Sequence, residues 1–174
     1  MELEKEIHQV KGFRNDYQKA SVNIIYTGKW MMQFHADVFK PYNLTIQQYN
    51  ILRILRGQHP NAATVKLIRE RMLDRMSDAS RIVELLRKKG LIERTICEGD
   101  RRRMDVIITE NGLQVLQEID KESERMDKRL SSLNEQEISQ LNFLLDKIRN
   151  IISLLPYILY PLSFIFSEDS PLFY

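Results

Sequence analysis

The segment 77–109 constrains this chain most, because it joins an amphipathic helix to a strongly basic hairpin. The pattern predicts a helix that opens at Ser77 and ends at Gly90, since glycine readily closes a helix C-terminus. Two short strands are predicted to follow, at Leu91–Ile96 and Val106–Ile108. A helix that fits a groove, next to a cationic hairpin, is typical of a protein that binds duplex DNA.

The predicted helix separates into an apolar arc and a polar arc on a helical wheel. The apolar arc holds Ala79, Ile82, Val83 and Leu86, and the polar arc holds Ser77, Ser80, Arg81, Glu84 and Lys88. Arginine can bind guanine through two hydrogen bonds, serine can bind a base or a phosphate, and glutamate can accept from cytosine N4. Most surface helices are amphipathic, so a solvated face is the alternative, and only the neighbouring hairpin favours DNA.

The turn of the hairpin, predicted at Glu98–Arg103, contains Asp100 followed by Arg101, Arg102 and Arg103. Adjacent like charges repel each other, and a tight turn does not need three of them. Phosphates or a narrow minor groove would supply the counter-charge. Asp100 can hold one guanidinium extended through a bidentate contact. The alternative is a solvated tip with a local Asp–Arg pair.

The rest of the chain is predicted to be mostly helical. The expected helices are Asp16–Phe39, Ile46–Arg56 with Thr45 and Gln48 as a capping box, a short helix from Thr64 to Met72, Glu110–Leu130 after Thr109, and a last helix from Asn134. The first and the last two helices carry more apolar surface than a small lobe can cover. We therefore expect them to pack on one another and on a second subunit.

The charge distribution supports a basic lobe. The net charge of the chain is only +2, which by itself implies no nucleic acid. Residues 53–103, however, hold fourteen Lys and Arg against seven Asp and Glu, so the remainder is net acidic. This asymmetry is expected of a DNA-contacting lobe on a neutral scaffold. A chain of 174 residues with 43% hydrophobic residues suits one domain with a helical appendage.

Other kinds of chemistry have little support in the sequence. His8, His35 and His59 lack metal-ligand spacing, and no phosphate loop or nucleophile elbow appears, so we expect no metal, no cofactor and no enzyme activity. Cys97 is the only cysteine, which suits a reducing compartment; a small strand residue is favoured over a redox switch. No signal segment or spanning helix is predicted, so a cytoplasmic location is expected.

Together these motifs resemble the MarR family of bacterial winged helix-turn-helix transcription regulators. The matching segments are Leu44–Thr45, Thr64–Ile68, Ser80–Val83, Leu85–Arg94, Asp100–Arg103 and Ile108–Thr109. The resemblance implies a homodimer whose two winged lobes bind a pseudo-palindromic operator. Members of the family usually repress, and many release DNA on binding a small phenolic or lipophilic molecule, or an oxidant. The alternative is a winged-helix protein-interaction module without DNA binding.

The resemblance also assigns residues and boundaries. It implies a mostly α fold with a small two-stranded wing (α+β), a single domain over 1–155, a winged lobe at about 44–112 and dimerisation helices at about 13–39 and 110–155. Arg102 becomes the wing-tip arginine and Asp100 its orienting partner. The expected DNA-binding set is Thr64, Lys66, Ser77, Ser80, Arg81, Glu84, Lys88, Asp100, Arg101, Arg102 and Arg103.

Two parts of the chain keep open interpretations. Trp30, Met31, Phe34 and Tyr49 could line an effector cavity, or could belong to ordinary core packing. The segment 156–174 is apolar, resembles no part of the family, and has no assigned role.

Overall fold

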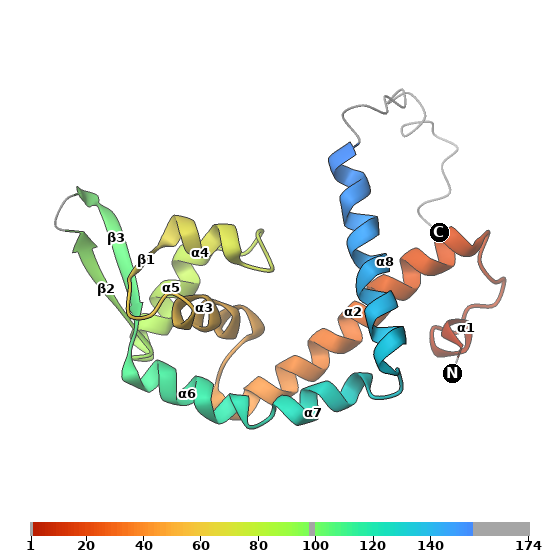
Figure 1. Cartoon of the computed structure of the whole chain (residues 1–174), viewed down its shortest axis with the longest axis horizontal. Helices are drawn as coiled ribbons and strands as arrows, with labels where there is room; N and C mark the ends of the chain where they lie inside the picture. Colours follow the sequence, from red (N-terminus) through yellow and green to blue (C-terminus); the bar gives the residue numbers. More distant parts are fainter. Residues whose placement is uncertain (1, 98–99, 155–174) are drawn as a thin grey trace. The chain divides into compact units, whose positions relative to one another are not determined.

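The computed structural model describes residues 2–97 and 100–154; the side chains of 96–104 and 151–154 lie outside that description. The elements are α1 (Leu3–Glu6), α2 (Asp16–Phe39), η1 (Lys40–Tyr42), α3 (Ile46–Arg56), β1 (Ala63–Thr64), α4 (Val65–Arg71), α5 (Ala79–Lys88), β2 (Ile92–Cys97), β3 (Asp100–Ile108), α6 (Glu110–Asp120), α7 (Ser123–Asp127), η2 (Lys128–Leu130) and α8 (Glu135–Leu154) (Figure 1). The chain divides after Met126 into two compact units. The predicted class, mostly helical with a small sheet, is confirmed.

Side-chain caps fix several helix starts where the sequence predicts them. The Thr45 hydroxyl accepts a hydrogen bond from the Gln48 amide, and the Gln48 side chain accepts one from the Thr45 amide, both at 3.2 Å. Thr64 and Thr109 cap α4 and α6 in the same way. Each cap satisfies an amide that a helix start leaves free, which stabilises a helix by about 1 kcal/mol.

The start of α5 differs from the prediction. Ser77 does not open this helix, because Asp78 is the N-cap and its carboxylate accepts from the Arg81 amide at 3.0 Å. The Ser77 hydroxyl instead donates to the Asp74 carboxylate at 2.6 Å. Two adjacent residues can both cap a helix, and here the first is already bound to the preceding turn.

The sheet has three antiparallel strands in the order β1-β3-β2, where the sequence predicts two. Ala63 of β1 pairs with Val106, a contact across more than forty residues that no local pattern reveals. The turn predicted at Glu98–Arg103 is also too long. Residues 100–103 belong to β3, because Asp100 still pairs with Cys97. The pairing shifts in register between Ile96 and Cys97.

The winged lobe, by which we mean α3 to α6 with the sheet, encloses the core of the first unit. Its side chains with no exposed surface are Ile51, Leu52, Ile68, Val83, Leu86, Val106, Leu116 and Ile119. The C-terminal part of α2 adds Phe34, Val38 and Phe39. Figure 1 shows β2 and β3 extending away from α3, α4 and α5. Fully buried side chains of this kind are the main source of the lobe's stability.

At the junction between α5, β2 and α6 the backbones are in direct contact. Gly90 has a φ of 69° and closes α5 as predicted, with the Leu91 amide donating to the Leu86 carbonyl at 3.2 Å. The Thr109 hydroxyl donates to the Gly90 carbonyl at 2.8 Å. A Cβ atom on Gly112 would lie 2.3 Å from the Leu91 carbonyl oxygen. Only glycine fits this first turn of α6 without moving the backbone.

The helix predicted at Glu110–Leu130 is interrupted, which corrects the sequence pattern. α6 ends at Asp120, and α7 begins at Ser123. The Asp120 carboxylate accepts from both terminal nitrogens of Arg56 on α3, at 2.6 and 3.3 Å. The break contains neither glycine nor proline, so the local sequence did not signal it.

In the second unit, α8 begins as predicted. The Asn134 side chain accepts from the amides of Gln136 and Glu137 at 3.0 Å, and the Glu137 carboxylate accepts from the Asn134 amide at 2.8 Å. None of residues 135–150 is buried. The predictions for the tail, 156–174, fall outside the described residues. Within the described ranges, no helix is long and apolar enough to cross a membrane.

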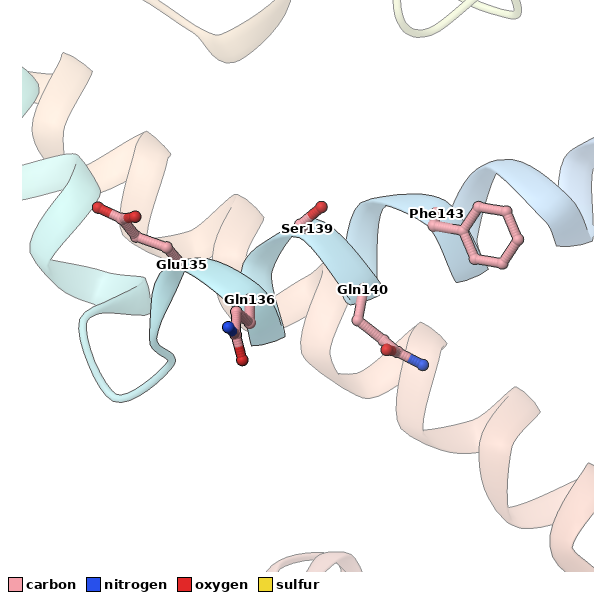
Figure 2. A pocket seen from close by; sticks show the side chains of 5 residues that line it. All are labelled: Glu135, Gln136, Ser139, Gln140 and Phe143. Carbon is pink, nitrogen blue, oxygen red and sulfur yellow. The ribbon is translucent and has the colours of Figure 1, made fainter.

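Figure 2 shows five side chains that follow one another along α8. Glu135, Gln136, Ser139, Gln140 and Phe143 line an open hollow of about 510 Å³. Phe143 is 61% exposed at one end of it. The hollow combines amide and carboxylate groups with one aromatic ring, on a helix that also exposes Leu144 and Ile148.

Candidate nucleic-acid interface

Helix α5 presents the polar arc that the sequence predicts. Ala79, Val83 and Leu86 are buried against the lobe, whereas Ser80, Arg81 and Lys88 are exposed. The buried residues fix the rotation of the helix about its axis, because they can enter the core in only one orientation. The exposed side chains therefore share a fixed face with hydroxyl and cationic groups.

Glu84 lies on the same helix but is engaged by two arginines. Its carboxylate accepts from Arg87 at 2.9 and 3.0 Å and from Arg94 at 3.4 Å. The hydrogen bond from Arg87 is the main reason that the pKa of Glu84 is lowered, and Arg94 adds to it. Since Arg94 belongs to β2, the Glu84–Arg94 pair ties the wing to α5. The predicted contact to cytosine would have to compete with both pairs.

A cluster of cations surrounds the start of α5. Lys66, Arg69, Arg75, Met76 and Ser77 are among the residues that line a hollow of about 380 Å³ between α4 and the N-terminal end of α5; Val65, Asp78, Ala79 and Ser80 complete its lining. In the described part of the chain, Lys66, Arg69 and Arg75 form no ion pair, and neither does Arg81. Arg53, Arg56, Arg87 and Arg94 on other surfaces of the unit are all paired with carboxylates. An anionic partner would supply the missing counter-charge here.

The turn between α4 and α5 is held by side-chain hydrogen bonds. The Asn50 side chain of α3 accepts from the Leu73 amide at 2.9 Å. The Asp74 carboxylate accepts from the Met76 amide at 3.0 Å and from the Ser77 hydroxyl. The Ser77 contact is the main cause of the lowered pKa of Asp74. The turn is therefore fixed in shape although its outer side chains are exposed.

The wing carries the arginine run at its outer end. Asp100, Arg101, Arg102 and Arg103 are the first four residues of β3, next to the hairpin connection. Their side chains lie outside the described part of the structure, so the predicted Asp100–Arg102 contact stays a prediction. The backbone places all three arginines on one strand, β3.

The remaining predicted residues lie around this surface. Thr64 is half-buried and its hydroxyl caps α4, while Lys66 is exposed. Ser77 is half-buried in the turn. Sequence reasoning omitted Arg69 and Arg75, although both fall in the basic segment that it identified. Their position beside α5 follows from the pairing of α4 with α5, which periodicity does not give.

The four residues predicted for an effector cavity do not line one common cavity in the structure. Phe34 is buried in the core, and Tyr49 stacks on Phe39 with ring centroids 4.1 Å apart. Met31 is half-buried. Trp30 is 42% exposed and lines a pocket of about 400 Å³ whose other lining residues are Leu3, Glu6, Asn23, Tyr26 and Thr27. The pocket beside Trp30 therefore has a different lining from the predicted one.

Among the described residues, no three His, Cys, Asp or Glu side chains stand close enough to hold an ion.

Comparisons with known proteins agree on one family. The model of the MarR family matches residues 42–103. The HTH-type transcriptional regulator MgrA of Staphylococcus aureus is 32% identical over 115 residues, which cover 66% of this chain and 76% of MgrA.

Solved structures share the fold. A MarR transcription factor from Planctomyces limnophilus superposes with a TM-score of 0.58 at 24% identity, covering 86% of this chain and all of that one. A mutant MarR from E. coli complexed with operator DNA gives a TM-score of 0.69 at 19% identity, covering 79% of this chain and 99% of that one.

Proposed function

This chain belongs to the MarR family of transcription regulators, and from that membership we propose that it is a homodimeric repressor that binds a pseudo-palindromic operator. The observation that carries the proposal is a cluster of cations around the outward face of α5, Lys66, Arg69, Arg75 and Arg81, which form no ion pair within the described part of the chain. The structural relative that was crystallised with operator DNA supports duplex DNA as the partner.

In this proposal α5 is the recognition helix and enters the major groove. Ser80 and Arg81 face base edges, where arginine forms two hydrogen bonds to guanine. Lys66, Arg69 and Arg75 neutralise phosphates along the groove, which adds affinity but no sequence information. The arginines at 101–103 extend this contact to the adjacent phosphates or minor groove. The Glu84–Arg94 pair keeps wing and helix in register.

The dimer part of the proposal depends on exposed apolar surface at both ends of the chain. Ile24, Ile25 and Trp30 are exposed on α2, and Phe143 and Ile148 are exposed on α8. Apolar surface of this extent on long helices is typical of a subunit interface. Two lobes bound to two half-sites raise the affinity well above that of one lobe. Release by a small apolar or phenolic effector stays a prediction, as does the cytoplasmic location.

The test is a fluorescence-anisotropy titration of random duplex at two salt concentrations, with the parent protein and the Arg102→Ala variant. Binding should weaken as the salt concentration rises. Arg102→Ala should lower the affinity, and it should make the slope of log affinity against log salt less steep by about one unit. Lys11→Ala is the matched control, because it removes one exposed charge in front of α2. Salt-independent or absent binding would favour the protein-interaction module instead.

A further inference from the structure

The turn between α4 and α5 exposes two large apolar side chains within a charged surface. Met76 is 95% exposed and Leu73 is 87% exposed. A single exposed apolar residue on a protein surface is common. These two differ from ordinary cases because they stand on a turn whose backbone is fixed by the Asn50 and Asp74 side chains.

Met76 is fixed at a defined distance from the start of α5. Its own amide donates to the Asp74 carboxylate, and the hydroxyl of the next residue, Ser77, donates to the same carboxylate. Asp78 then caps the helix. Met76 therefore precedes the N-cap by two residues, on a backbone that is already ordered. Because the backbone of this turn is already ordered, binding of a partner to Met76 costs little backbone entropy.

The neighbours of Met76 indicate which partner it would meet. It lines the hollow that also contains Lys66, Arg69 and Arg75, three cations without an ion pair in the described part of the chain. The three cations can bind phosphates. The thioether of Met76 cannot, so this side chain needs an apolar group of the DNA as its contact. The apolar group that duplex DNA offers between its phosphates is the C5-methyl of thymine in the major groove. Residues at the N-terminal end of a recognition helix contact base edges there.

We propose that Met76 contacts the C5-methyl group of a thymine and so sets a preference for that base at one position of each half-site. This inference rests on the proposed function and adds a specificity determinant to it. Leu73 lies on the other side of Asp74 in the sequence and is not part of the lining of the hollow. It is the matched control, since it is equally apolar and nearly as exposed.

The experiment removes one methyl group from the DNA and one side chain from the protein. The parent protein selects duplexes from a random pool, and the best duplex is then made with deoxyuridine in place of each thymidine in turn. Deoxyuridine keeps the base pair and differs from thymidine only in lacking the methyl group. Affinities are measured for the parent and for Met76→Ala, Met76→Leu and Leu73→Ala, with thermal unfolding as the check on folding.

At one thymine per half-site, the parent should lose about fourfold in affinity on uridine, which corresponds to about 0.8 kcal/mol for one buried methyl-sized group. Met76→Ala should lose affinity on thymine and show no further loss on uridine. Met76→Leu and Leu73→Ala should keep the discrimination.

The inference is overturned if the parent does not discriminate at any thymine, or if Met76→Ala discriminates as well as the parent at every thymine. A parent protein that selects no duplex would overturn the proposed function itself, and this inference with it.

Discussion

The winged lobe and helix α8 expose different kinds of side chain: the lobe exposes cations, and α8 exposes apolar side chains. The lobe buries Ile51, Leu52 and Leu116 completely, yet Lys66, Arg69 and Arg75 have no carboxylate partner among the described residues. In α8, Asp146 pairs with Arg149, and Lys147 lies 6.0 Å from the centroid of the Phe143 ring. Four large apolar side chains of this helix are exposed, namely Leu141, Phe143, Leu144 and Ile148.

The side chains that each region exposes indicate the kind of partner it binds. Unpaired cations on a rigid surface gain most from a polyanion, and their affinity depends on salt. Exposed apolar side chains on a long helix gain most from another apolar surface, and that gain depends little on salt. The two regions therefore suit a DNA-binding lobe and a dimerisation element, and each can be tested without changing the other.

The largest expected effect comes from removing α8. Truncation after Ser131 deletes the whole apolar face of this helix, so we expect a monomer and a loss of operator affinity on the order of 10²-fold or more. Analytical sedimentation and anisotropy measure the two effects. The core of the winged lobe should stay folded, because its buried residues all precede the cut. Full-length protein that sediments as a monomer at micromolar concentration, and still binds a palindromic site tightly, would contradict the dimer.

Matched truncations of one side chain separate the two regions. Leu52→Ala creates a cavity in the winged lobe and should lower the free energy of unfolding by about 2–5 kcal/mol. Ile148→Ala on α8 removes a side chain that is 51% exposed, so it should mainly weaken the dimer. Urea unfolding at several protein concentrations distinguishes these outcomes. Equal, concentration-independent losses in both variants would mean that Ile148 is buried within its own chain.

Arg81→Ala tests the cationic surface of the lobe. Its exposed position on α5 predicts contact with a base edge, so binding should weaken by about 1–3 kcal/mol on the operator and less on random duplex. Lys66→Ala is the companion variant, because a phosphate contact should weaken binding equally on both DNAs. Equal losses for Arg81→Ala would reassign it to a backbone contact.

The smallest effect concerns Glu84. Its pKa is lowered in the folded protein, chiefly by Arg87, so its charge stabilises the lobe above the ordinary value of 4.5 and this contribution is lost as the pH falls below it. Glu84→Gln should therefore unfold at a lower temperature than the parent at neutral pH. Thermal unfolding as a function of pH should show the two curves converging in acid. A difference that persists below the folded pKa would point to lost packing instead.

Features encoded by neighbouring residues were predictable from the sequence. The caps at Thr45, Thr64 and Thr109 depend on residues three positions apart, and the rotation of α5 depends on one amphipathic pattern. These predictions are confirmed because tertiary packing agrees with the local preference.

Features that depend on distant residues were not predictable in this way. Strand β1 pairs with Val106, the break after Asp120 coincides with an ion pair to Arg56, and Glu84 pairs with Arg94. No periodicity reports such contacts. The start of α5 failed for another reason, because Ser77 and Asp78 were both competent caps and the choice depended on Asp74.

The contact at Gly112 has a mechanical consequence. The first turn of α6 touches the Leu91 carbonyl at a distance that excludes even one methyl group, and the Thr109 amide donates to that same carbonyl at 3.1 Å. Backbone atoms in direct contact have no rotamers with which to absorb a displacement. We therefore expect a rotation of α6 to be transmitted to the start of β2, so that the wing changes its orientation together with the helix.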